Sequence, residues 1–440
     1  MADITTTRIF TDGERGITAA KLNDIVGSST IQPAFYSAKP VSSTLVAGDK
    51  MLALKSTGSY AQADFQSVID SVSAAISSDA EIWSVRLRSF SAVGNPNFEV
   101  DQRNAFAGLT NPPGGTFIQD RWAASKAGTT TMGGNWNIVT SGTNVPGTSF
   151  AITKNVLRFT LLTQQASLGA GDTCGVIQTI EGTQIRELLS DVTSISLLVR
   201  SSVAGLKFAV SIRDSPVTKS MVKLCTIPTA SVWTLVQLNN IPIFPAANFG
   251  IQPGQAGCVL GIFFAVGSSL VASAADTWQN GQFVGAPGMD NFGSKPVNSI
   301  FDVAFVQFEP GPVCSTFMDR PFIQNLDECL RYYCKSYSYP VKPGSVDSVG
   351  IQSFLNQGTQ HPWYCYMPFK KVMAKVPTVT GYSPATGAAG VIRNISAPAD
   401  LAINQVANLG DSAFAGFQLV AAPPASLWGS QWHYVADTGW

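Results

Sequence analysis

Short hydrophobic runs, separated by Gly, Pro, Asn and Ser, follow one another from Gly94 to about Phe322. Several alternate apolar and polar residues with a period of two, and most are rich in β-branched or aromatic side chains, as is typical of strands. The predicted strands span residues 157–161, 195–200, 206–212, 233–238, 259–264 and 301–308. Because no long amphipathic helix lies between them, the pattern predicts a jelly-roll-like β-sandwich over residues 93–325.

The pattern changes only slightly after this region. A short helix is expected just before Arg331-Tyr332-Tyr333, and the residues that follow indicate strands joined by turns that contain proline. Residues 326–440 are therefore predicted to form a second β-domain. The chain as a whole is expected to be mainly β, with helix well below a quarter of its residues.

The first 30 residues are polar and rich in turns. One short helix is expected from Thr18 to Val26, with Thr18 as its N-cap and Gly27 ending it. An apolar patch that so short a segment cannot bury by itself consists of Ile17, Leu22, Ile25 and Val26. Residues 1–30 are interpreted as a segment that docks on a partner protein.

Residues 31–92 predict a small α/β neck domain. A turn at Gly48-Asp49 is flanked by apolar residues, a helix is expected to begin at Tyr60, and a strand is expected over residues 83–87. One face of this helix carries a near-heptad stripe formed by Phe65, Val68, Val72 and Ile76. Such a stripe predicts parallel packing in a homotrimer, or alternatively packing on the sheet of the neck itself.

The charge of the chain changes this picture by excluding one class of partner. Only 13% of the 440 residues are charged, and 28 basic residues balance 28 acidic ones. A nucleic-acid-binding protein usually carries a basic patch, so we expect no nucleic-acid partner. Few charges and many small or β-branched residues are typical of sheets that pack against another surface, as in a long-lived extracellular β structure.

The N-terminus contains neither a basic stretch nor an apolar stretch of the kind found in secretory signals, so folding in a cytoplasm is expected. The seven cysteines are then expected to be buried free thiols. Only His361 lies near Cys365, which gives little support for zinc, and no metal or cofactor is predicted. No membrane span is predicted either, because no window of eighteen residues is apolar without interruption.

Several motifs resemble, in the same order, elements of the carbohydrate-binding-module-like β-sandwich of phage tail fibres and the terminal β-domain that follows it. These motifs are Phe98-Glu-Val-Asp-Gln-Arg103, Asp120-Arg-Trp122 and the segments 196–202, 307–312, 314–321, 329–337, 373–387 and 432–437. The resemblance spans about residues 95 to 440. It departs from the pattern at Asp101, where many relatives carry Trp.

The resemblance implies a phage virion structural protein, in particular a tail fibre or spike that binds a host surface polysaccharide. The implied location is the virion, assembled in the bacterial cytoplasm, with residues 1–30 attaching the chain to other tail or head proteins. The alternative is a head fibre, a capsid decoration or a tail-nozzle component without direct receptor binding. A glycan-degrading spike is a third possibility.

Aromatic residues late in the chain are the first candidates for recognition. The predicted ligand-binding residues are Trp363, Tyr364, Trp428 and Trp432, because aromatic faces beside short polar groups suit stacking on sugars. Burial in the core or in a subunit interface is the alternative. Trp122 with Arg121 offers a second stacking pair, but a structural role is favoured for both, with the aromatic ring buried in the sandwich and Arg121 in an ion-pair network with Asp101 and Arg103.

No enzymatic activity is predicted. Asp and Glu are sparse, whereas glycoside hydrolysis uses a pair of carboxylates. The two histidines, His361 and His433, lie outside any recognised nucleophile motif.

Overall fold

The computed structural model describes residues 50–54, 60–64, 91–129, 131–144, 151–189, 192–245, 249–357, 365–421 and 427–440. The chain divides into two compact units, residues 1–86 and residues 87–440, which are taken separately below.

In the first unit the structure describes one antiparallel hairpin. Strand β1 (Lys50–Leu54) pairs with β2 (Tyr60–Asp64), so that Leu54 lies opposite Tyr60. The prediction of a helix that begins at Tyr60 is therefore wrong for residues 60–64. Pairing with β1 satisfies the backbone of these residues, and the helical spacing in the sequence starts only at Phe65.

Two sets of predicted residues lie outside the described part of the chain. They are the attachment residues Ile17, Leu22, Ile25 and Val26 and the trimer-interface residues Phe65, Val68, Val72 and Ile76. Both sets stay predictions, as does the division of the first 92 residues into an anchoring segment and a neck.

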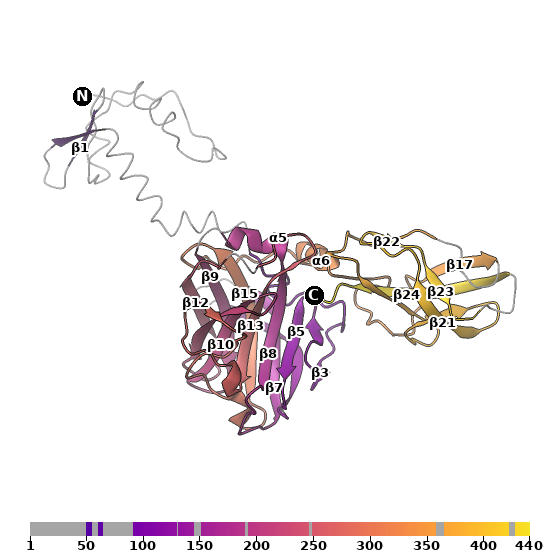
Figure 1. The fold of residues 1–440 in the computed structure, drawn as a ribbon, viewed down its shortest axis with the longest axis horizontal. Helices are drawn as coiled ribbons and strands as arrows, with labels where there is room; N and C mark the ends of the chain where they lie inside the picture. Colours follow the sequence, from indigo (N-terminus) through magenta and orange to yellow (C-terminus); the bar gives the residue numbers. More distant parts are fainter. Residues whose placement is uncertain are drawn as a thin grey trace. The chain divides into compact units, whose positions relative to one another are not determined.

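The second unit begins with a sandwich of two antiparallel sheets (Figure 1). One sheet has the order β14 (Gln279–Asn280), β11 (Lys219–Ile227), β10 (Leu206–Asp214), β13 (Ala256–Val266), β8 (Thr173–Glu181), β5 (Trp122–Ala127) and β4 (Phe117–Gln119). The other has the order β12 (Thr234–Ile241), β9 (Thr193–Ser201), β15 (Ile300–Pro310), β7 (Ala151–Thr163), β6 (Gly133–Asn144) and β3 (Leu109–Thr110). The six strands predicted from the sequence are all confirmed.

Period-two alternation explains how the sandwich buries its core. Along β15, Phe301 and Val303 point inward, a bulge follows, and Val306 and Phe308 point inward after it. The bulge inserts one residue and so keeps both halves of the strand facing the core. A cluster of phenylalanine rings lies between the sheets, with Phe159 and Phe264 at 4.7 Å between ring centroids.

Helices are short in the described residues. They comprise α5 (Gly182–Ile185), α6 (Phe322–Leu330) and three-residue 3-10 turns at residues 186–188, 268–270 and 292–294. The helix predicted before Arg331 is confirmed as α6. None of the helices described is long and apolar enough to cross a membrane.

Strand β24 (Leu427–Asp437) organises the C-terminal domain (Figure 1). Its last residues pair with β16 (Tyr333–Lys335) on one edge and β19 (Thr378–Tyr382) on the other, and its first residues pair with β17 (Gln352–Gln357) and β20 (Val391–Asn394). The sheet continues through β21 (Ala399–Val406) and β23 (Phe417–Leu419), and β18 (Met367–Pro368) pairs separately with β22 (Ala413–Phe414). The prediction of a second β-domain is confirmed, and the protein is mainly β.

All seven cysteines are free thiols, six of them buried and Cys365 half-buried. Burial raises the pKa of Cys174, Cys225 and Cys314 to about 12, so these thiols stay protonated at neutral pH. In these buried positions they act as small apolar side chains.

Candidate functional site

Trp428 and Trp432 lie in the core of the C-terminal domain, and both rings are fully buried. The Trp432 ring stacks on Phe354 at 4.8 Å and meets the Phe417 ring edge-on at 5.8 Å. Both tryptophans lie on the face of β24 that packs inward. The prediction that they contact a ligand is therefore wrong for this fold, and the core alternative holds for both. Trp363 and Tyr364 lie outside the described residues and stay predictions.

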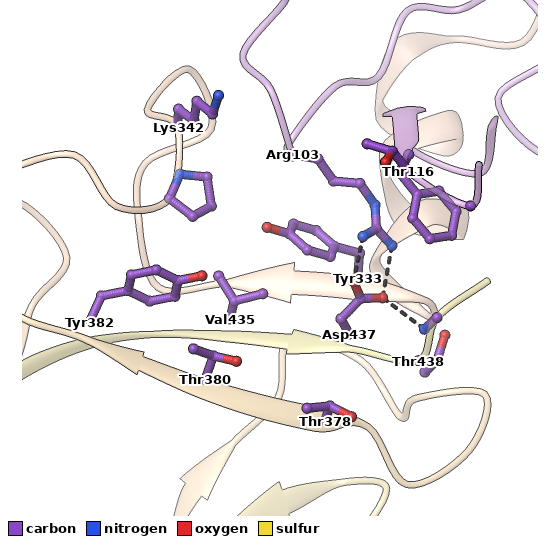
Figure 2. Close-up of a pocket in the computed structure, with 14 residues that line it drawn as sticks. Arg103, Thr116, Tyr333, Lys342, Thr378, Thr380, Tyr382, Val435, Asp437 and Thr438 are labelled. Atoms are coloured by element: carbon purple, nitrogen blue, oxygen red, sulfur yellow. Dashed lines mark hydrogen bonds and ion pairs between the residues drawn. The ribbon is translucent and has the colours of Figure 1, made fainter. Parts of the chain in front are cut away.

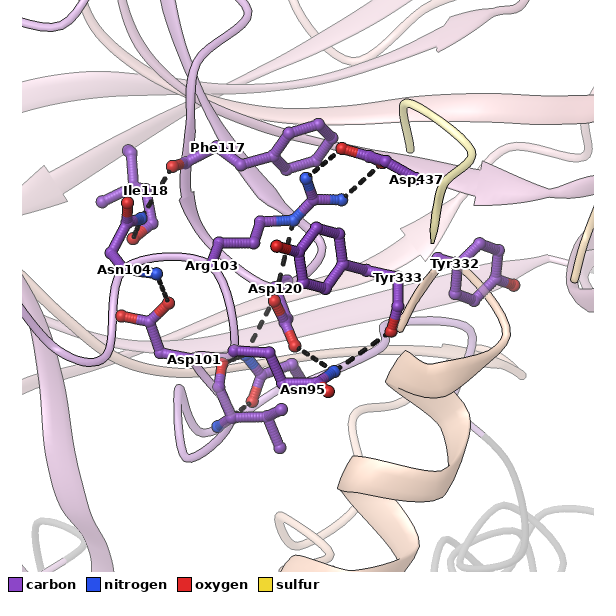
Figure 3. A network of polar contacts seen from close by, with 12 residues as sticks. Asn95, Asp101, Arg103, Asn104, Phe117, Ile118, Asp120, Tyr332, Tyr333 and Asp437 are labelled. Carbon is purple, nitrogen blue, oxygen red and sulfur yellow. Dashed lines mark hydrogen bonds and ion pairs between the residues drawn. The ribbon is translucent and has the colours of Figure 1, made fainter. Parts of the chain in front are cut away.

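Arg103 joins the two β-domains (Figure 3). Its guanidinium lies between two rings, 3.8 Å from the centroid of Phe117 in the sandwich and 4.1 Å from that of Tyr333 in the C-terminal domain. It also donates two hydrogen bonds to Asp437, at 2.5 and 2.9 Å, and its Nε lies 3.6 Å from a carboxylate oxygen of Asp120. A planar guanidinium suits both contacts, the stacked rings and the two-oxygen carboxylate.

The charges around Arg103 shift the titration of two groups. Burial alone would lower the pKa of Arg103, but the carboxylates of Asp437 and Asp120 raise it above its ordinary value. Burial raises the pKa of Asp120 to about 7, although Arg103 and the amide of Gln102 act in the opposite direction. Near neutral pH the carboxyl group of Asp120 is therefore protonated in part of the molecules and ionised in the rest.

A second set of contacts also joins the sandwich to the C-terminal domain, and together with the contacts of Arg103 it forms the junction between the two domains. The carboxylate of Glu181, at the end of β8, accepts hydrogen bonds from Nε and a terminal nitrogen of Arg331 at 2.8 and 2.6 Å, and from the Tyr332 hydroxyl at 2.8 Å. Burial would raise the pKa of Glu181, but the hydrogen bonds from Arg331, Gly254 and Tyr332 lower it below its ordinary value. Arg331 and Tyr332 directly follow α6, so the start of the C-terminal domain is held to the sandwich.

Trp122 and Arg121 are structural. The Trp122 indole is buried, donates from Nε1 to the carbonyl of Asn95 at 3.0 Å and contacts the Phe98 ring at 5.3 Å. Arg121 lies over the ring of Tyr332 at 3.6 Å and donates to the carbonyl of Thr179. The structural interpretation is confirmed.

The prediction of an ion-pair network formed by Asp101, Arg103 and Arg121 is wrong. Arg103 pairs with Asp437 and Asp120, whereas Arg121 takes the ring and carbonyl contacts given above. Asp101 accepts hydrogen bonds from the backbone N–H groups of Asn104 and Phe106 at 2.9 and 2.8 Å, and so fixes a turn. The three side chains are close in the sequence but bond to different partners.

Lys335 holds the loop of residues 338–345. Its buried ammonium donates to the carbonyl oxygens of Gln102, Tyr339 and Val341 at 2.8, 2.9 and 2.5 Å. Burial lowers the pKa of Lys335 to about 8, against the raising effect of Asp120 and Asp101. The loop is thereby tied both to its own domain and to the sandwich.

An open cleft of about 570 Å³ lies beside Arg103 (Figure 2). Its floor is formed by three paired strands, with Thr378 of β19 opposite Asp437 of β24, and Asp437 opposite Tyr333 of β16. Residues 115–117 of the sandwich contribute a second side, and the loop with Lys342 contributes a third. The cleft is therefore built by both domains at the place where Arg103 joins them.

The floor of the cleft is a row of hydroxyl groups. Thr378, Thr380 and Tyr382 alternate with the buried Val379 and so lie on one face of β19. Within the described part of the chain, no hydrogen bond is formed by the hydroxyls of Thr116, Tyr333, Thr378, Thr380 and Tyr382. These hydroxyls remain available to a ligand, because each can donate and accept.

Tyr382 supplies an aromatic surface next to this row. Its half-buried ring meets Tyr337 edge-on at 6.2 Å, and Tyr337 in turn stacks on His433 at 3.7 Å. This stack fixes the position of Tyr382 at the edge of the cleft (Figure 2). Tyr382 was not among the ligand-binding residues predicted from the sequence; the alternation Thr-Val-Thr-Gly-Tyr is the signal that could have identified it.

No protein-family model matches the chain, and no curated protein matches it. Among solved structures, TmCBM61 in complex with β-1,4-galactotriose is 10% identical, with a TM-score of 0.26, over 50% of this chain and 99% of that one. A family 11 carbohydrate-binding module from Clostridium thermocellum is 11% identical, with a TM-score of 0.24, over 44% of this chain and 89% of that one.

A third solved structure comes from a phage. The enzymatically active domain of tailspike protein 4 of bacteriophage CBA120 is 14% identical, with a TM-score of 0.24, over 52% of this chain and 22% of that one. All three TM-scores are too low to support an inference about function. The strand pairing described above is what defines the sandwich.

Proposed function

We propose that the protein binds carbohydrate in the cleft between its two β-domains, as a fibre or spike of a phage particle. The observation that carries the proposal is the row of unbonded hydroxyls on the cleft floor, directly beside a junction whose charged groups are bonded to one another. A polar surface that has no internal partner is suited to a polar ligand.

Sugars match the two kinds of surface that the cleft offers. A pyranose ring has an apolar C–H face that can stack on Tyr382, and hydroxyls that can exchange hydrogen bonds with Thr378 and Thr380. The threonines lie on a paired strand, so their positions are fixed before a ligand arrives. Such preorganisation lowers the entropy cost of binding.

The charged groups of the cleft favour binding over hydrolysis. Asp437 is the one carboxylate among the described residues that line the cleft, and it is bonded to Arg103. Glycoside hydrolysis uses two carboxylates on opposite sides of the scissile bond. The proposal is therefore for recognition without catalysis.

The fibre role rests on the resemblance of residues 95–440 to tail-fibre modules and on the low charge of the chain. In this proposal residues 1–30 attach the chain to the virion and three copies assemble around the neck. One cleft per chain would then give three equivalent sites, and multivalent engagement turns weak single sites into useful avidity. Labelling the C-terminus in images of particles tests the location, because a tail fibre places it at the distal end of the tail.

The binding proposal is tested with an immobilised panel of bacterial oligosaccharides. Tyr382→Ala and Thr380→Ala are expected to weaken binding about tenfold each, because each removes roughly 1.4 kcal/mol of contact. Tyr366→Ala is the matched control, since Tyr366 is 75% exposed in the same domain and does not line the cleft. Equal binding by all three variants and the unaltered protein would refute a site in the cleft.

A further inference from the structure

Three charged side chains line the cleft: Arg103, Asp437 and Lys342. Arg103 and Asp437 are bonded to each other, so their charges largely cancel. Lys342 is exposed, and among the described residues no carboxylate pairs with its ammonium. The cleft therefore presents one uncompensated positive charge.

The backbone that carries Lys342 is fixed, although its ammonium has no carboxylate partner within the described part of the chain. Val341 N–H donates to the carbonyl of Ser338 at 3.1 Å, and Ser345 N–H donates to the carbonyl of Lys342 at 3.2 Å. Gly344 has a φ of +85°, which favours glycine, and its N–H donates to the Tyr337 hydroxyl at 3.2 Å. Together with the Lys335 ammonium, these contacts hold Lys342 at the rim of the cleft (Figure 2).

Asp347, the acidic residue in the segment that follows the loop, does not neutralise this charge. Its Oδ1 accepts a hydrogen bond from the backbone N–H of Val349, its carbonyl is bonded to His433, and it does not line the cleft. On the opposite side, residues 115–117 are uncharged. An anion in the cleft would meet one free cation and no free carboxylate among the described residues.

We propose that the cleft selects acidic saccharides, whose carboxylate or phosphate group pairs with the Lys342 ammonium while the sugar ring lies along Tyr382. This inference rests on the proposed carbohydrate binding and adds the chemical class of the ligand. A partly exposed ion pair contributes little on its own, so the expected gain over the uncharged sugar is about two- to fivefold at low salt. Salt screens such a pair, so the gain should shrink at high salt.

The test compares saccharides that differ in one group: a neutral oligosaccharide, its uronic acid counterpart and its phosphorylated counterpart. Lys342→Gln is measured against Lys370→Gln, because Lys370 is also exposed, its ammonium has no carboxylate partner among the described residues, and it lies outside the cleft. Titration calorimetry is run at low and at high salt. A preference for the uronic acid alone or for the phosphate alone identifies the anionic group.

Lys342→Gln is expected to lower affinity for the acidic saccharide about two- to fivefold and to leave the neutral one unchanged, while Lys370→Gln changes neither. An unchanged acidic preference in Lys342→Gln, or the same affinity of the unaltered protein for the acidic and the neutral saccharide, overturns the proposed pairing with Lys342. In that event, a remaining dependence on Tyr382 keeps carbohydrate binding in the cleft. Absence of binding by every saccharide overturns both.

Discussion

The junction and the cleft lie side by side and share Arg103, Tyr333 and Asp437. They differ in whether their polar groups are bonded to other groups of the protein. In the junction, charged groups are buried or half-buried and bonded across the two domains, as with Glu181 and Arg331. In the cleft, the threonine hydroxyls and the Lys342 ammonium are open and unbonded within the described residues. Bonded groups hold the domains together, and the unbonded groups are those that the proposed ligand would contact.

The same difference distinguishes the residues of the sequence motifs from the residues proposed to bind a ligand. Most motif residues discussed above, such as Arg103, Trp122 and Tyr332, have their polar groups in the junction or the core. The row of hydroxyls on the cleft floor comes from β19, whose short alternation resembles that of many other strands. Removing a buried charge from its partner is costly, whereas removing an exposed hydroxyl is close to neutral for folding. Substitutions in the junction should therefore lower stability, whereas substitutions in the cleft should lower ligand binding.

The largest effect is expected from Trp432→Ala, which removes a fully buried ring from the C-terminal core. The lost contacts with Phe354 and Phe417 and the cavity left behind should cost about 3–5 kcal/mol of unfolding free energy. Chemical denaturation measures this loss. Tyr382→Ala, in the same domain, serves as the comparison and should cost far less. Unchanged stability of Trp432→Ala together with lost binding would return Trp432 to the candidate ligand contacts.

Arg103→Met tests the junction itself and is expected to cost about 3 kcal/mol, because Asp437 and Asp120 lose their partner. The cost lies at the low end for buried pairs, since the Asp437 side chain remains 30% exposed. Limited proteolysis should show faster cleavage between the domains. Lys342→Met is the control, because Lys342 borders the same cleft without an ion pair among the described residues. Equal melting of the two variants would mean that Arg103 does not hold the junction.

Features that depend on contacts between neighbours in the sequence were predictable, and features that depend on contacts between distant residues were not. Period-two alternation predicted the strand at residues 195–200 and its neighbours, because that signal is local. Tyr60 was misassigned because a helical spacing that starts at Phe65 was extended back into residues that pair with β1. Trp428 and Trp432 were misassigned because only the pairing of β24 shows that their face is covered.

The cleft itself has no local signature. Arg103 and Asp437 are separated by 334 positions, and the contact between them brings β19 and residues 115–117 to the same place. A sequence pattern indicates which face of a strand is polar, but not which distant segment lies opposite. The residues of the cleft could therefore be assigned to strands and turns in advance, and not to one another.

The smallest expected effect is a pH dependence of the unfolding free energy. It arises from Asp120 and distinguishes this residue from the ion pairs around it. Burial raises the pKa of Asp120 to about 7 from its ordinary 3.8, so the folded protein binds its proton more tightly than the unfolded chain does. The stability that this proton contributes is complete below about pH 4 and is lost as the pH rises through about 7. Between about pH 5 and about pH 7 the loss should be about 2 kcal/mol.

Asp120→Asn removes this titration, so its unfolding free energy should fall less than that of the unaltered protein over the same range. The charged groups around Asp120 include Arg103, Asp101 and Lys335, and all three remain in Asp120→Asn. Burial raises the pKa of Asp101 above its ordinary value and lowers that of Lys335 to about 8, so the comparison of the two proteins isolates Asp120. The folded pKa of Lys335 lies below its ordinary 10.5, so its contribution changes above about pH 8 and with the opposite sign. Denaturation curves for both proteins across the range decide the matter, and parallel pH profiles would show that Asp120 is ionised throughout and belongs with the permanently charged groups of the junction.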